Sequence, residues 1–184
     1  MTAANRITLL RIAMTIAMVA IYYLVPGDAG LIATTVVFLL AALTDALDGY
    51  LARARGQVTS FGKLIDPIAD KLLMCAALLI LLEIGALSVW AAFIFLGREF
   101  IISGFRLVVA SQSQTVISAN MWGKLKTVAQ DAMIVTMLLV PVLPAAFVII
   151  GQVLLWAAIG LTIVSAVVYL AQNWRLLGDN VFGG

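Results

Sequence analysis

Six long apolar segments divide the chain and strongly limit the folds it can adopt. They cover residues 6–25, 29–53, 62–85, 87–111, 120–143 and 146–172. A helix of about 20 apolar residues is long enough to cross the hydrocarbon core of a bilayer. Charged residues make up 11% of the 184 positions, against about 25% in soluble domains. The sequence therefore predicts an all-α integral membrane bundle of six transmembrane helices, with residues 1–184 forming a single domain.

The distribution of charge predicts which helix ends face the cytoplasm. With six spans, all 11 Lys and Arg residues fall on one side of the membrane or in the half of a span nearest to it. The loops on the other side hold Asp28 and Glu83 and no cation. Because cytoplasmic loops are enriched in Lys and Arg, we expect both termini to be cytoplasmic. The first apolar run is long and shows no small-residue cleavage site, so we expect a spanning helix there and not a signal peptide.

The absence of histidine restricts the chemistry that the chain can perform. It contains no histidine and a single cysteine, Cys75. This composition excludes zinc sites built on His or Cys, a histidine general base and an internal disulfide. Proton transfer must therefore use carboxylates, lysines, tyrosines or a metal ion.

Four aspartates gather where the second segment ends and the third begins. Asp45 and Asp48 are three positions apart, and Asp66 and Asp70 are four positions apart. Residues at these spacings share one face of a helix. Since the connection between the two segments is short, the helices are expected to be antiparallel neighbours. We therefore expect the two pairs of carboxylates to face each other at the cytoplasmic end of the bundle.

Four carboxylates at membrane depth require compensating positive charge. An aspartate at the centre of a transmembrane helix costs about 2.5–3.5 kcal/mol on insertion scales, and neighbouring like charges repel. Mg²⁺ and Mn²⁺ prefer such hard oxygen ligands, and pairs of these ions commonly serve phosphoryl transfer. The pattern thus predicts a two-metal phosphoryl-transfer site. Ion transport through buried carboxylates is the alternative from another class of protein, and it is disfavoured because the outer halves of the segments hold few polar residues.

The same stretch resembles the signature of the CDP-alcohol phosphotransferase family. From Asp45 to Asp70 it reads Asp-x2-Asp-Gly-x2-Ala-Arg-x8-Gly-x3-Asp-x3-Asp, and all eight fixed residues match. The resemblance implies six membrane helices, usually in a homodimer, and displacement of CMP from a CDP-linked group with two divalent cations, Mg²⁺ or Mn²⁺.

The resemblance also implies a role for each matched residue. The metal ligands would be Asp45, Asp48, Asp66 and Asp70. Of these, Asp70 would also be the general base for the acceptor hydroxyl. The cytidine pocket and the contacts to the nucleotide or its diphosphate would come from Gly49, Ala52, Arg53 and Gly62. For either glycine, close packing of two helices is an equally good explanation.

Basic residues outside this stretch predict a site for a phosphorylated acceptor. Arg98 and Arg106 lie in the fourth segment, and Lys124 opens the fifth. Clusters of arginine and lysine suit a phosphate dianion. The alternative is snorkelling, in which a long cationic side chain extends to the membrane surface. We expect snorkelling for Lys126 and Arg175 more than for Arg98, which lies deeper in an apolar run.

Two further stretches resemble one branch of the family, the bacterial phosphatidylglycerophosphate synthases. They are GREFIIS at 97–103, followed by Arg106, and GKLKTVAQ at 123–130. This resemblance implies transfer of a phosphatidyl group from CDP-diacylglycerol to sn-glycerol 3-phosphate, in phospholipid biosynthesis at the cytoplasmic side of the inner membrane. Inositol phosphate, serine or phosphatidylglycerol remain as alternative acceptors. Membrane lipid is then an expected partner, and nucleic acid is not.

Polar residues also recur in the first segment, near its expected cytoplasmic end. Asn5, Thr8 and Arg11 are spaced by three positions, and the family's first helix carries a similar run. We expect them to contact the donor diphosphate or the surroundings of the metal site. A capped helix start with snorkelling arginines is equally consistent with the pattern. Asp131, inside the fifth segment, is an intramembrane acid without an assigned role: it would pair with a cation or line the cavity.

Overall fold

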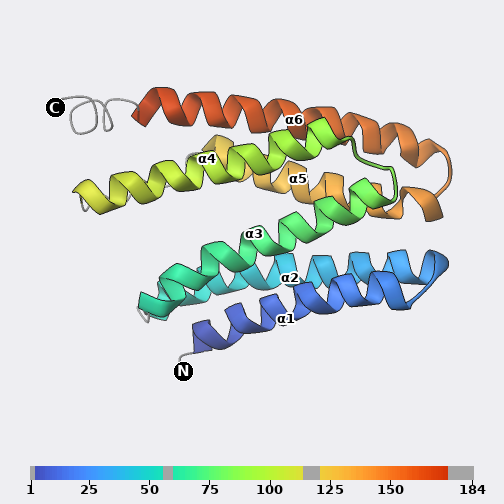
Figure 1. Ribbon diagram of the computed structural model, residues 1–184, viewed down its shortest axis with the longest axis horizontal. Coiled ribbons are helices and arrows are strands. Elements are labelled where there is room, and N and C mark those ends of the chain that lie inside the picture. Colours follow the sequence, from blue (N-terminus) through green and yellow to red (C-terminus); the bar gives the residue numbers. More distant parts are fainter. Residues whose placement is uncertain (1–2, 56–59, 114–120, 174–184) are drawn as a thin grey trace. The chain divides into compact units, whose positions relative to one another are not determined.

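The computed structural model describes the backbone of residues 3–55, 60–113 and 121–173, and the side chains of 7–44, 65, 67–109 and 121–173. Within these ranges the chain is helical almost throughout and has no strand (Figure 1). The α-helices are α1 (Ala3–Leu24), α2 (Gly27–Arg55), α3 (Ser60–Glu83), α4 (Val89–Ser113), α5 (Met121–Leu139) and α6 (Ala146–Asn173). A short 3₁₀ helix, η1 (Val140–Val142), follows α5. The all-α prediction and its helix count of six are confirmed.

Four of the described helices are long and apolar enough to cross a membrane: α1, α2, α5 and α6. The other two are of similar length, but α3 begins with charged residues around Asp70, and α4 carries Arg98, Glu99 and Arg106 near its middle. The chain is therefore a multi-pass membrane protein, and the assignment of spans to α3 and α4 stays a prediction.

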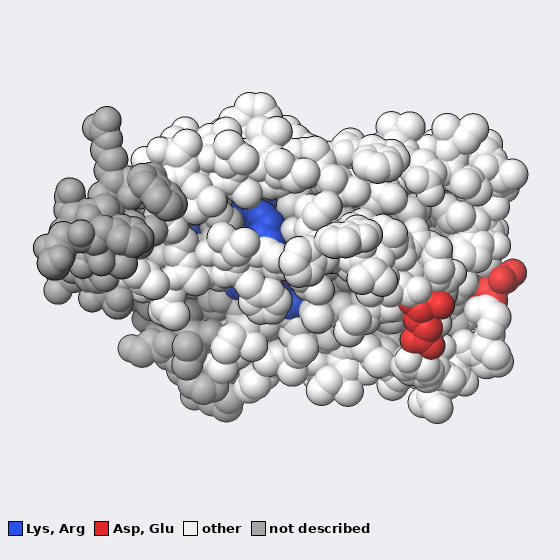
Figure 2. Space-filling model, turned by 45° about the horizontal axis from the view of Figure 1, so that its top comes forward, with Lys and Arg blue, Asp and Glu red and all other residues white. Residues whose placement is uncertain are grey.

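Large apolar side chains point outward on every helix. Ile16 on α1, Phe100 on α4 and Trp156 on α6 each expose more than half of their area. Among the described residues on the face drawn in Figure 2, Lys and Arg atoms come into view in hollows between uncharged side chains. Such a surface is costly in water, at about 25 cal/mol per Å² of apolar area. In lipid it costs little, because acyl chains are as apolar as leucine.

The described chain divides into two compact units, which are treated separately. The first contains residues 1–87 and 134–149, and the second contains residues 88–133 and 150–184. In the first unit α1 packs against α2 and α3, and α2 packs against α3 and η1. The end of α2 and the start of α3 therefore belong to the same packed group of helices (Figure 1).

Two glycines shape the tight turn between α1 and α2. Gly27 has a φ of +71°, in the left-handed region that favours glycine. At Gly30 a Cβ atom would lie 1.9 Å from the carbonyl oxygen of Val25, so no larger residue fits there without a backbone shift. At the same end of the first unit, Tyr23 donates a hydrogen bond of 2.6 Å to Glu83, which joins the end of α1 to the end of α3. The turn therefore fixes α1 and α2 side by side.

In the second unit, α4 packs against α6 through a small apolar cluster. Ile102, Phe105 and Val109 lie one turn apart on α4 and are buried with Tyr169 of α6. The rings of Phe105 and Tyr169 meet edge to face, with centroids 5.8 Å apart. This contact holds the cationic part of α4 next to α6.

Candidate active site

The helices place the four aspartates at the spacing that the sequence predicts. Asp45 and Asp48 belong to the last turns of α2, and Asp66 and Asp70 to α3, so each pair shares one helix face. Both helices lie in the first unit, where α2 packs against α3. The Asp70 side chain is half-buried. The side chains of the other three aspartates lie outside the described residues, and no metal-binding cluster occurs among the side chains that are described.

The residues predicted for the donor pocket are helical as well. Gly49, Ala52 and Arg53 belong to the last two turns of α2, and Gly62 lies in the first turn of α3. Their surroundings lie outside the described side chains, so their roles stay predictions. What the backbone supports is their placement beside the aspartates on the same two helices.

The polar residues of α1 are buried. Thr8 is 3% exposed and Arg11 is 2% exposed. The guanidinium of Arg11 therefore does not extend to the surface of the molecule, as a snorkelling arginine would. The Thr15 hydroxyl donates to the Arg11 carbonyl oxygen over 2.9 Å. The Asn5 side chain lies outside the described residues.

A network of three charged side chains lies in the second unit. Arg98 Nη1 donates to Glu99 Oε1 over 2.9 Å, and Lys126 Nζ of α5 donates to the same oxygen. All three side chains are largely buried, and that of Lys126 is 1% exposed. The expectation that Lys126 snorkels is therefore wrong. A cation that is buried in this way requires a paired carboxylate, and Glu99 provides it.

Arg98 keeps donors that the network does not use. Its Nε is buried and has no hydrogen-bond partner among the described residues. A buried donor of a charged group is costly to leave unpaired. The planar guanidinium can bind a carboxylate or phosphate through two parallel hydrogen bonds. The arrangement can therefore accept an anion at Arg98.

Arg106, two turns further along α4, contacts a residue that the sequence analysis did not single out. Its Nε donates to the Tyr169 hydroxyl over 3.2 Å, and its guanidinium carbon lies 5.1 Å from the centre of the Tyr169 ring. Tyr169 is 2% exposed. Hydrogen bond and cation–π attraction act together here, so Tyr169 restrains the guanidinium from one side.

A family model for the CDP-alcohol phosphatidyltransferases matches residues 1–164. The chain belongs to this family. It is 40% identical to the CDP-diacylglycerol–glycerol-3-phosphate 3-phosphatidyltransferase of Bacillus subtilis, over 94% of this chain and 95% of that protein. The enzyme of the same name from Pseudomonas fluorescens is 36% identical, over 95% of this chain and 91% of its own length. A cardiolipin synthase (CMP-forming) of Oryza sativa is 39% identical, over 96% of this chain and 59% of its own length.

The family membership confirms the resemblance that the aspartate signature carries. Family membership does not say which basic residues are free to bind substrate and which pair with other side chains. The structure separates the two lysines of α5 in this respect. Lys124 and Lys126 are two positions apart, or about 200° around a helix. Lys126 is buried against Glu99, whereas Lys124 is exposed.

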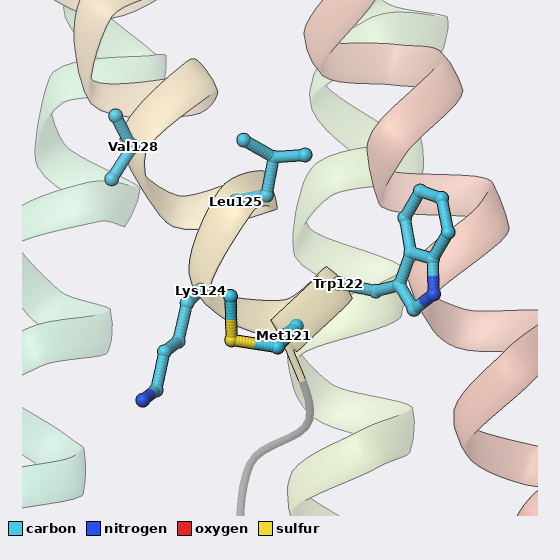
Figure 3. A pocket seen from close by; sticks show the side chains of 5 residues that line it. All are labelled: Met121, Trp122, Lys124, Leu125 and Val128. Carbon is cyan, nitrogen blue, oxygen red and sulfur yellow. The ribbon is translucent and has the colours of Figure 1, made fainter.

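Lys124 borders a shallow hollow on the first turns of α5. The hollow has a volume of about 340 Å³ and is lined by Met121, Trp122, Lys124, Leu125 and Val128. Lys124 and Trp122 extend to different sides of the helix (Figure 3). Apart from the ammonium group this lining is apolar, so the hollow suits hydrocarbon and an anionic head group more than a polar metabolite alone. The role of Lys124 in phosphate binding stays a prediction.

Tyr169 and Lys126 are the site residues that sequence reasoning missed. One signal was present on α6, because Thr162, Ser165 and Tyr169 follow each other at helical spacing and all three are buried. A polar stripe of this kind in an apolar helix marks the side that faces protein. The signal around Lys126 is weaker: Gln130, one turn later, is polar and buried as well, but Leu125 and Thr127 on either side of Lys126 are exposed. Asp131 is half-buried on α5.

Proposed function

We propose that the protein transfers the phosphatidyl group of CDP-diacylglycerol to sn-glycerol 3-phosphate, yielding phosphatidylglycerophosphate and CMP. The observation that carries the proposal is the match, over nearly the whole chain, to two enzymes named for this reaction. The buried cationic groups of the second unit support a phosphorylated acceptor. An acceptor hydroxyl attacks the phosphorus that bears the diacylglycerol, and the bond from that phosphorus to CMP breaks.

The four aspartates fit a pair of divalent cations. Members of the family generally use divalent cations, and carboxylate oxygens are the donors that Mg²⁺ and Mn²⁺ prefer. Two such ions would be held by Asp45, Asp48, Asp66 and Asp70. When bound, they neutralise the charge of the diphosphate and stabilise CMP as it leaves. With no histidine in the chain, the Asp70 carboxylate takes the proton from the attacking hydroxyl.

The remaining residues bind and orient the two substrates. In this proposal Gly49, Ala52 and Gly62 leave room for cytidine, while Arg53 holds the diphosphate. Thr8 and Arg11, with Asn5, support that end of the site from α1. Arg98, Arg106 and Lys124 bind the phosphate of the acceptor, and the burial of Arg98 strengthens its attraction to an anion.

The proposal also covers the membrane topology and the assembly. All six helices cross the cytoplasmic (inner) membrane, both termini are cytoplasmic, and the site opens to that side. Residues 1–184 act as one domain, and two copies form a homodimer. The charge pattern supports this orientation, because Asp28 and Glu83 are exposed at helix ends that carry no cation.

A second acceptor has a specific observation in its favour. The chain is 39% identical to a plant cardiolipin synthase, so phosphatidylglycerol is the leading alternative. Such an acceptor would bring its phosphate within a lipid, and the basic residues would then bind a diester with one charge. Serine and inositol phosphate follow behind it.

One assay separates these possibilities. Purified protein in detergent is supplied with CDP-diacylglycerol, Mg²⁺ or Mn²⁺, and one acceptor at a time, and release of CMP is measured. We expect CMP with sn-glycerol 3-phosphate and its loss when EDTA removes the cations. Release of CMP with phosphatidylglycerol alone would show that phosphatidylglycerol, and not sn-glycerol 3-phosphate, is the acceptor. No release of CMP with any acceptor would overturn the enzyme assignment.

A further inference from the structure

We infer that Glu99 is a positioning residue: it holds Arg98 and Lys126 in one arrangement, so that Arg98 presents its unused donors to the phosphate of the acceptor. The inference rests on the proposed function and deepens it, since it explains how the acceptor side is organised. Glu99 itself touches neither substrate.

The contact between Arg98 and Glu99 is not imposed by the helix. Neighbouring residues on a helix lie about 100° apart and do not normally face each other. Arg98 Nη1 nevertheless lies 2.9 Å from Glu99 Oε1. The Arg98 side chain must therefore bend towards its neighbour, and this ion pair keeps it in that conformation.

Lys126 restrains the Glu99 carboxylate from another helix, α5. Its ammonium binds the same Glu99 oxygen, and the two residues are 27 positions apart in the sequence. Because Lys126 of α5 restrains the Glu99 carboxylate, the Arg98 side chain can reach that carboxylate in only a narrow range of conformations. Lys126, with 1% exposure of its side chain, therefore acts on Arg98 through Glu99.

The Arg98 guanidinium keeps hydrogen-bond donors that Glu99 does not use. Only Nη1 of Arg98 is used by Glu99, and the buried Nε has no partner among the described residues. Two cations and one carboxylate leave the network with one net positive charge. A buried group with net positive charge and a spare donor is suited to an anion. The proposed reaction provides two anions: the diphosphate of the donor, which the proposed function assigns to Arg53 and the metal ions, and the phosphate of the acceptor, which we assign to Arg98.

A purely structural ion pair between α4 and α5 is the competing explanation. It predicts that loss of Glu99 lowers thermal stability and weakens the binding of both substrates to the same extent. A positioning role predicts a selective loss, in which the apparent KM for the acceptor rises while that for CDP-diacylglycerol is kept. Two-substrate kinetics therefore distinguish the two explanations.

The test compares Glu99→Gln with Glu83→Gln. Glu83 is an exposed glutamate that accepts a hydrogen bond from Tyr23 in the first unit, so it is a matched control for loss of one carboxylate. For Glu99→Gln we expect the KM for sn-glycerol 3-phosphate to rise about 10-fold, from the loss of a charge-assisted hydrogen bond. The KM for CDP-diacylglycerol should change less than about twofold, and Glu83→Gln should behave as wild type. A KM for the acceptor within about twofold of wild type, or an equal rise for both substrates, would overturn the inference.

A second pair of variants adds a measurement that is independent of turnover. Lys126→Met should raise the KM for the acceptor as Glu99→Gln does, and Lys126→Arg should restore it, since an arginine can also bind Glu99. Thermal stabilisation by sn-glycerol 3-phosphate, without donor, should be present in wild type and in Lys126→Arg and reduced in Lys126→Met. Equal stabilisation in all three would contradict the inference. A wild type that releases no CMP with any acceptor would overturn the proposed function, and the inference with it.

Discussion

The two units of this chain organise charge in different ways. In the first, four aspartates occur on consecutive turns of two helices that are joined by a short connection. In the second, Glu99 binds both its neighbour Arg98 and Lys126, which lies 27 positions beyond Glu99 along the chain. Arg106 donates to Tyr169, which lies 63 positions further along. Local spacing is sufficient to bring together Asp45 with Asp48 and Asp66 with Asp70, which we call the acidic group. The basic group, Arg98 and Arg106 with Lys126, depends on how helices that are distant in the sequence pack. The acidic group should therefore tolerate changes in packing better than the basic group does.

The largest effect is expected at the acidic group. Asp70→Asn should lower CMP release at least about 1,000-fold, because the amide neither accepts the proton nor ligates a metal as a carboxylate does. The measurement is kcat in detergent at saturating substrates. Asp28→Asn, which removes an exposed carboxylate from the first turn of α2, is the matched control. Activity of Asp70→Asn within about tenfold of wild type would remove Asp70 from the mechanism.

The next effect separates the two lysines of α5. Lys126→Met leaves Glu99 without its partner on that helix, and breaking a buried ion pair costs about 3–5 kcal/mol. Lys124→Met removes an exposed charge and should change the free energy of unfolding by less than about 0.5 kcal/mol. We therefore expect a much lower Tm for Lys126→Met alone, measured by thermal unfolding in detergent. Equal Tm values for the two variants would show that the burial of Lys126 contributes nothing.

The smallest effect is expected from a single hydroxyl. Tyr169→Phe removes the acceptor of the Arg106 hydrogen bond but keeps the aromatic ring beneath the guanidinium. We expect the KM for sn-glycerol 3-phosphate to rise about threefold to fivefold, with the KM for the donor unchanged. Tyr169→Leu, which also removes the ring, should have the larger effect because the cation–π attraction is lost as well. A larger effect from Phe than from Leu would contradict this reading of the contact.

Much of the fold was predictable because its signals are local. Apolar runs of membrane length and the turn residues between them gave helices within a few residues of those observed, such as 146–172 for α6. Helix geometry decides which of the aspartates share a face, and the resemblance of the eight fixed residues between Asp45 and Asp70 to the family signature was sufficient to indicate the family.

The acceptor side was less predictable for a physical reason. In a membrane protein the lipid-facing side of a helix is as apolar as the side that faces protein, so the pattern around Lys126 does not reveal that it points inward. The pairing of Lys126 with Glu99, like that of Arg106 with Tyr169, follows from tertiary packing and has no counterpart in local sequence. Snorkelling was a reasonable expectation for Lys126, and burial of its side chain corrects it.

The measurement that tests the account most directly is a comparison of two-substrate kinetics for Arg53→Ala and Arg106→Ala. In the proposed function Arg53 of the first unit binds the donor, and Arg106 of the second unit binds the phosphate of the acceptor. Arg53→Ala should therefore raise the KM for CDP-diacylglycerol, and Arg106→Ala should raise the KM for sn-glycerol 3-phosphate, each by about 10-fold or more and each with the other KM nearly unchanged. If both variants raise the same KM, or if each raises both equally, the assignment of the donor to Arg53 and of the acceptor's phosphate to Arg106 is wrong.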